Sequence, residues 1–157
     1  MNKFFILLFS SVVALQTKLF TTPIFSFMPK LKLHHIVLLS KSTDKNIFNN
    51  NIIDDVYIID YTPLEDLNLK TGLKLFLGGK INGHVRIVHM NKINKTTLID
   101  DWYNETKFNT LNKLDDENIN EIIRKWDTTF QVYGNNCQHF GKYMINEIDR
   151  LKYYKSI

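Results

Sequence analysis

The spacing of apolar residues changes once along this chain, and that change narrows the possible folds more than any other feature. Before residue 100 the apolar side chains lie in short runs, such as residues 56–62 and 84–90, separated by turn signals such as Asn82-Gly83. After Asp115 they follow the i, i+3, i+4, i+7 spacing of an amphipathic helix: Ile119, Ile122, Ile123 and Trp126. Strands first and helices second predict an α+β fold with helices packed against one antiparallel sheet.

The same patterns predict the individual elements. We expect a sheet of about four strands, at residues 31–39, 56–62, 84–90 and 96–102, with a loop over 40–55 and a helix or excursion over 65–77. Asp115-Asp116 can cap a first helix, and a second should begin at Asn135 or Asn136. The buried stripe of that second helix would be Phe140, Tyr143, Met144, Ile148 and Leu151.

The N-terminus has the pattern of a targeting segment. Lys3 precedes an apolar stretch over residues 4–15, and small residues would allow cleavage after Ala14. This stretch is too short to predict a transmembrane helix. We therefore expect a secretory signal or membrane-targeting leader over 1–29, with a bipartite organellar leader as the alternative, and a folded domain over 30–157. The protein would lie in the secretory pathway or at a membrane.

Composition excludes several classes of protein. The 157 residues are 44% hydrophobic and 13% aromatic, which suits one globular domain. The net charge is +4 with scattered lysines, so nucleic-acid binding is not expected. A single cysteine excludes an intramolecular disulfide and any multi-thiolate zinc site. Neither His34/His35 nor His84/His89 belongs to a recognisable set of metal ligands.

That one cysteine, Cys137, is the first candidate for chemistry. If Asn135 or Asn136 caps the second helix, Cys137 lies in its first turn, where backbone N–H groups and the helix dipole stabilise a thiolate. The same N–H groups could bind the oxyanion of a tetrahedral intermediate. Two interpretations remain open: a reactive thiol, or a cysteine that packs inward as a small hydrophobe.

A thiol nucleophile needs a base, normally an imidazole. His139 lies two residues after Cys137 and would point to a different helix face, so we assign it a local structural hydrogen bond. His34 and His35 lie within an apolar strand, and adjacent strand residues face opposite sides, so we expect only one of them to face the cysteine. The remaining candidate strand, residues 84–90, carries His84 and His89.

Residues 136–140, Asn-Cys-Gln-His-Phe, resemble the Asn-Cys-Glu-His-Phe motif of the lecithin:retinol acyltransferase-like family, circularly permuted relatives of the NlpC-type papain-fold peptidases. In that family the catalytic histidine lies on an early strand and the cysteine lies late, at a helix N-terminus. The order matches here, and the resemblance implies a papain-like fold. His35 followed by three apolar residues and Ser40-Lys41 resembles the family's histidine strand, so it implies His35 as base, with His34 and His84 as runners-up.

Two positions depart from the family pattern. Gln138 replaces the usual Glu, and the next strand offers Asp60 where many members carry a histidine. Asp60 could orient the imidazole, or it could be a turn former ahead of Thr62-Pro63. Asn136 and Gln138 are the expected N-cap and oxyanion positions.

The resemblance implies a cysteine-dependent acyl transferase or hydrolase that works through a thioester. Its substrates would be lipid acyl esters or peptide and isopeptide bonds, and it would need neither metal nor organic cofactor. A membrane surface is a further partner that the apolar N-terminus suits. The departures support the alternative of a catalytically inactive secreted or membrane-associated interaction module with the same fold.

Overall fold

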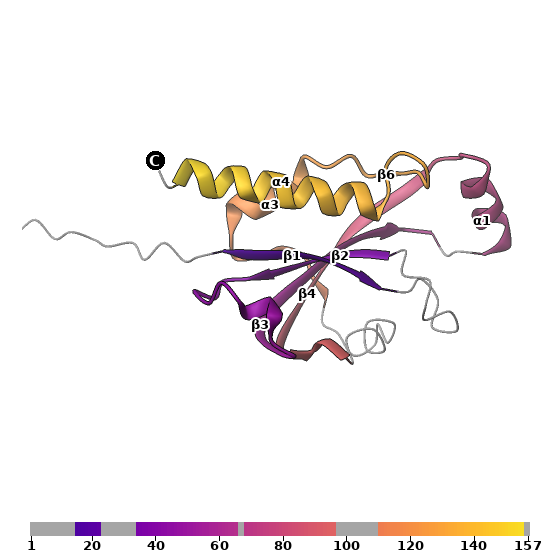
Figure 1. Ribbon diagram of the computed structural model, residues 1–157. Coiled ribbons are helices and arrows are strands. Elements are labelled where there is room, and N and C mark those ends of the chain that lie inside the picture. The colour runs from indigo at the N-terminus through magenta and orange to yellow at the C-terminus, as the bar shows by residue number, and fades with distance from the viewer. Residues whose placement is uncertain (1–14, 23–33, 66–67, 97–109, 156–157) are drawn as a thin grey trace, which may run out of the picture.

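The computed structural model shows an antiparallel sheet with one long helix across one of its faces (Figure 1). The structure describes residues 15–22, 34–65, 68–96 and 110–155. Within this part of the chain the sheet has six strands in the order β1-β2-β3-β4-β5, with β6 pairing β4. The α+β prediction is confirmed. The strands are β1 (Gln16–Thr22), β2 (His34–Ser40), β3 (Ile52–Pro63), β4 (Ile81–Asn94), β5 (Thr110–Leu111) and β6 (Thr129–Phe130).

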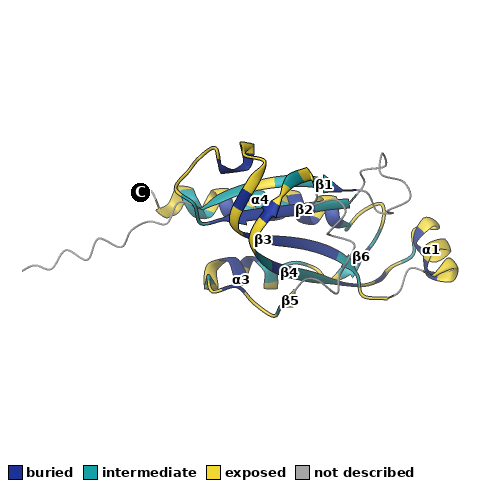
Figure 2. Ribbon diagram, turned by 90° about the horizontal axis from the view of Figure 1, so that it is seen from below, coloured by how far each residue is buried: buried dark blue, intermediate teal, exposed yellow. Residues whose placement is uncertain are grey.

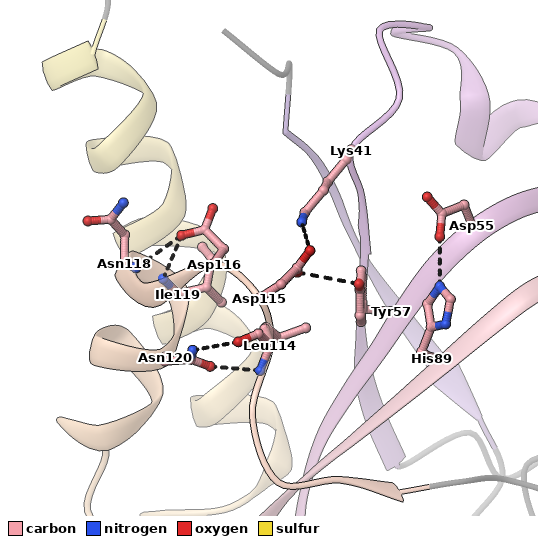
Figure 3. Close-up of polar contacts among 10 residues, drawn as sticks. All are labelled: Lys41, Asp55, Tyr57, His89, Leu114, Asp115, Asp116, Asn118, Ile119 and Asn120. Carbon is pink, nitrogen blue, oxygen red and sulfur yellow. Dashed lines mark hydrogen bonds and ion pairs between the residues drawn. The ribbon is translucent and has the colours of Figure 1, made fainter. Parts of the chain in front are cut away.

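Within the described ranges, the helices bounded at both ends are short except for the last, α4. They are η1, a 3-10 turn (Ile47–Asn49), α1 (Leu69–Phe76), α3 (Glu117–Arg124) and α4 (Cys137–Lys155). Asp116 caps α3 as predicted, because its side chain accepts hydrogen bonds from the backbone of Asn118 and Ile119 (Figure 3). No helix in the described ranges combines the length and the apolar character needed to cross a bilayer.

Each face of the sheet has its own hydrophobic core. On one face Val37, Leu39 and Ile59 pack with residues of α3 and α4, including Phe140 and Met144. Alternation along the strands sends Ile36, Leu38 and Ile58 to the other face, where they pack with η1. The middle of the sheet is therefore buried on both sides (Figure 2).

The expected start of the domain at Lys30 is wrong. Residues 16–22 form the edge strand β1, which pairs with β2 from Gln16↔Ser40 to Thr22↔His34. Leu19 of β1 packs into the core under α4. The strand was missed because its apolar residues continue the hydrophobic stretch before it, although three threonines favour a strand. Residues 1–14 and 23–29 of the predicted leader lie outside the described residues.

Within the described residues the sheet has six strands where about four were predicted, and two of the predicted strands are longer than expected. β3 begins at Ile52, so residues 52–55 belong to a strand and not to the predicted loop, and β4 extends from Ile81 to Asn94. The region predicted as helix or excursion contains α1, and the second helix begins directly after Asn136. The strand predicted over 96–102 lies outside the described residues except for Thr96.

Candidate active site

The loop before α4 is held by hydrogen bonds, and Cys137 follows it as the first residue of the helix. The loop closes through backbone hydrogen bonds between Gln131 and Asn135. The Asn135 side chain donates to the carbonyl oxygens of Asp127, at 2.9 Å, and Thr129. These amide contacts fix the backbone just before the cysteine, so the position of Cys137 does not depend on the helix alone.

Asn136 caps α4, as predicted. Its Oδ1 accepts hydrogen bonds from the backbone N of Gln138 at 2.9 Å and of His139 at 3.2 Å. The same oxygen lies 2.9 Å from His139 Nδ1, which must carry the proton because an amide oxygen only accepts. His139 therefore has the local structural role expected of it. The cap also occupies the backbone N–H of Gln138, which was one of the predicted oxyanion positions.

Helix α4 lies unusually close to the sheet one turn beyond the cysteine. A Cβ added at Gly141 would lie 2.5 Å from Leu19 Cδ1 on β1 and 3.9 Å from His35 Cβ on β2. Only a residue without a side chain permits this approach. It brings the N-terminus of α4, and with it the buried Cys137, against the beginning of β2.

Both histidines at the beginning of β2 lie near Cys137. Cys137 Sγ lies 4.0 Å from His35 Nδ1, and Cys137 also contributes to the raised pKa of His34. His35 lies on the sheet face that α4 covers, whereas His34 lies with Asp60, as the alternation of strand residues predicts. Pairing with β3 begins only at Ile36, so these two residues are paired with β1 alone.

Asp60 is completely buried and holds His34, not the predicted His35. His34 Nε2 lies 2.8 Å from Asp60 Oδ2. Arg86 donates to the same carboxylate through Nε to Oδ1 at 3.1 Å and Nη2 to Oδ2 at 2.7 Å. The sheet register explains this arrangement, because Asp60 pairs with Arg86 on β4 and with Ile36 on β2, two residues from His34. Asp60 is therefore no turn former.

The charges of this cluster set the protonation of His34. Burial alone would lower its pKa, but the hydrogen bonds and charges of Asp60 and Cys137 outweigh burial and raise the pKa from 6.5 to about 9. Burial alone would raise the pKa of Asp60, but the hydrogen bonds from His34 and Arg86 lower it below its usual value. At neutral pH the cluster therefore holds an imidazolium beside a carboxylate.

Arg86 is the member of the cluster that the sequence interpretation missed. The signal available was a charged residue between apolar neighbours in the strand 84–90, but its partner depended on the register with β3. The runner-up base His84 lies two residues earlier on β4 and pairs with Thr62. Its Nδ1 is buried and has no hydrogen-bond partner within the described part of the chain.

A second histidine–carboxylate pair, between His89 and Asp55, is more exposed than the pair between His34 and Asp60. His89 Nε2 lies 2.6 Å from Asp55 Oδ1, and nearby Lys41 and Tyr57 share Asp115 (Figure 3). The Asp55 side chain is 71% exposed, whereas Asp60 is fully buried. Exposed pairs of this kind contribute little energy. Of these two pairs, the one at Asp60 lies near the Cys137 thiol.

Comparison with protein-family models, with curated proteins and with solved structures found no match to this chain. The resemblance to the lecithin:retinol acyltransferase-like family therefore remains a prediction.

Proposed function

We propose that this chain is a cysteine-dependent acyl transferase or hydrolase with a papain-like site. Cys137 is the nucleophile, His34 the acid and base, and Asp60 the group that orients His34. The observation that carries the proposal is the hydrogen-bonded series from His34 to the buried Asp60 and on to Arg86, with Cys137 close enough to help raise the pKa of His34. The order of the elements and the motif at residues 136–140 support a lecithin:retinol acyltransferase-like assignment.

The burial of Asp60 supports a role beyond stability. Moving a carboxylate out of water is costly, and a buried ion pair is often no more stabilising than well-packed apolar residues. A carboxylate that fixes one ring nitrogen of a histidine, by contrast, determines which nitrogen faces the reacting group. Here Nε2 is bonded to Asp60, which leaves Nδ1 of His34 for the thiol.

In the first half of the reaction, the Cys137 thiolate attacks the acyl carbonyl carbon. The carbonyl π electrons move to oxygen and form a tetrahedral oxyanion. When that intermediate collapses, the bond to the leaving alcohol or amine breaks, and the protonated His34 gives its proton to the leaving group. The products of this half are a thioester on Cys137 and a neutral His34.

In the second half, water or another alcohol, amine or lysolipid attacks the thioester carbonyl. His34 takes the proton of the attacking group, the carbon–sulfur bond breaks, and thiolate and imidazolium are restored. Water gives hydrolysis and the other acceptors give acyl transfer. The substrates proposed are lipid acyl esters and amide or isopeptide bonds.

The first turn of α4 supports the oxyanion. Its N-terminal dipole favours negative charge at this end. Because Asn136 occupies the Gln138 backbone N–H, we assign the side-chain amide of Gln138 as the polar donor near the intermediate. His35, at 4.0 Å from the thiol, is the second basic group at the site, and Asp60 is what favours His34 over it.

The proposal is tested with a panel of a phospholipid, an isopeptide and a peptidoglycan-like amide, each incubated with the wild-type chain and with Cys137→Ser. We expect turnover of one class, an acylated Cys137 peptide in the mass spectrum, and loss of both in Cys137→Ser. His34→Ala should lose turnover more severely than His35→Ala. No turnover of any class, with Cys137 never acylated, would favour the inactive interaction module.

A further inference from the structure

Helix α1 presents large apolar side chains to solvent. Leu69 is 91% exposed, Leu73 58%, Phe76 70% and Leu77 75%. Their spacing of i, i+4, i+7 and i+8 places them on one face of the helix. Folded soluble domains rarely leave such a group uncovered unless the surface binds something.

The opposite face attaches α1 to the rest of the protein. Thr71 and Leu75 are its buried residues, and they lie one turn apart. Figure 2 shows the helix at one end of the molecule with most of its surface exposed. The apolar face therefore points outward, away from the two cores, and its exposure does not result from an incompletely packed interior.

Basic side chains accompany this face. Lys70 and Lys74 on α1 and Lys80 just after it are all exposed. A long lysine side chain beside an apolar helix face can lie along the apolar surface while its ammonium group contacts phosphates. Outward apolar residues with flanking lysines are the pattern of a helix that lies in the interface of an anionic membrane.

The surface extends to the loop that carries the cysteine. Tyr133 Oη donates to the carbonyl oxygen of Phe76 at 3.0 Å, and the exposed Val132 and Tyr133 belong to the loop that ends at Cys137. Figure 1 shows α1 at the end of the molecule where α4 begins. A membrane bound by α1 would therefore lie near the end of α4 that carries Cys137.

We propose that the α1 surface, formed by Leu69, Leu73, Phe76, Leu77 and Tyr133, inserts into the interface of a bilayer that contains anionic phospholipids. The proposal rests on the function proposed above in one respect: if the chain is an acyl transferase or hydrolase, docking on a membrane favours lipid acyl esters as its substrate class. The lysines attract the anionic surface, and the apolar side chains then enter the boundary between headgroups and acyl chains. The protein would meet its substrate at the surface of a membrane.

Docking is tested by fluorescence in a Cys137→Ser background, where turnover plays no part. An environment-sensitive NBD label is attached at Leu73→Cys, and at Asn118→Cys on the exposed part of α3 as the matched control. Vesicles of phosphatidylcholine with phosphatidylserine should raise and blue-shift the emission of the label at position 73 and leave position 118 unchanged. Vesicles of phosphatidylcholine alone should have a weaker effect.

Three outcomes would overturn docking. The first is unchanged emission at 73 while the protein sediments with vesicles, which would mean that another segment holds it there. The second is an equal response at 73 and 118. The third is emission that rises with protein concentration in the absence of lipid, which would assign the surface to a second copy of the chain.

Activity separates failure of docking from failure of the catalytic proposal. Leu73→Glu should lower vesicle binding at least about tenfold, because it removes an apolar anchor and adds a charge. Asn118→Glu carries the same charge change and should not. Leu73→Glu should lose turnover of vesicle lipid but keep turnover of a water-soluble thioester. If the wild type turns over neither substrate, the catalytic proposal fails, whereas the fluorescence result still decides docking.

Discussion

Raising the pH from about 6 to about 9.5 is expected to destabilise the folded protein through His34. The pKa of His34 is about 9 in the fold against 6.5 for an unperturbed histidine, because Asp60 and Cys137 outweigh the effect of burial. A group with a raised pKa binds its proton more tightly in the folded state. Its stabilisation is therefore fully present below pH 6.5 and is lost as the pH rises through 9.

The difference between the two pKa values corresponds to about 3 kcal/mol of unfolding free energy. The His34 side chain is only 16% exposed, so solvent screening reduces this value little. Asp60 affects the unfolding free energy in the acid range instead. Its pKa is lowered, so its contribution is present above its ordinary value and is lost as the pH falls into the acid range.

Urea unfolding at intervals across this pH range measures the effect, with His34→Gln as the control. Glutamine keeps a hydrogen-bond donor for Asp60 but does not titrate. The wild-type free energy should fall by about 3 kcal/mol more than that of the variant between pH 6 and 9.5. Parallel profiles for the two proteins would refute the charged His34–Asp60 pair.

Two further predictions concern packing and capping. Gly83→Ala should cost about 1 to 3 kcal/mol of unfolding free energy, because the new Cβ would lie 2.5 Å from the ring of the buried Tyr61. Gly72→Ala should be neutral or stabilising, because a Cβ there would have nothing within 4 Å. Urea unfolding of both variants compares the two effects. Asn136→Ala should cost about 1 kcal/mol and also slow alkylation of native Cys137, because the cap fixes the first turn of α4. An unchanged alkylation rate in that variant would show that the cap does not position the thiol.

Local patterns in the sequence were enough to predict much of the fold. The change of hydrophobic period separated strands from helices, and the caps Asp116 and Asn136 followed from residue type, because capping depends only on neighbours in the chain. β1 was missed because an edge strand that directly follows a hydrophobic stretch has no period of its own.

For the candidate site, the sequence predicted which residues lie near one another better than it predicted which of them pair. Cys137, His35, His34 and Asp60 were all named from sequence, but which histidine meets Asp60 depends on the β2–β3 register. A shift of one residue in register exchanges the faces of a strand, and no local signal determines it. Arg86 was missed for the same reason.

The central claim is that Cys137 is an activated thiol served by His34, and alkylation tests it most directly. Native wild-type protein, His34→Ala and His35→Ala are treated with iodoacetamide from about pH 5 to about pH 9.5, and modification of Cys137 is followed by mass spectrometry. We expect native wild-type Cys137 to be alkylated faster than Cys137 of His34→Ala at neutral pH, and His35→Ala to lie closer to the wild type. Reaction of Cys137 only after denaturation, or an unchanged profile in His34→Ala, would contradict this claim.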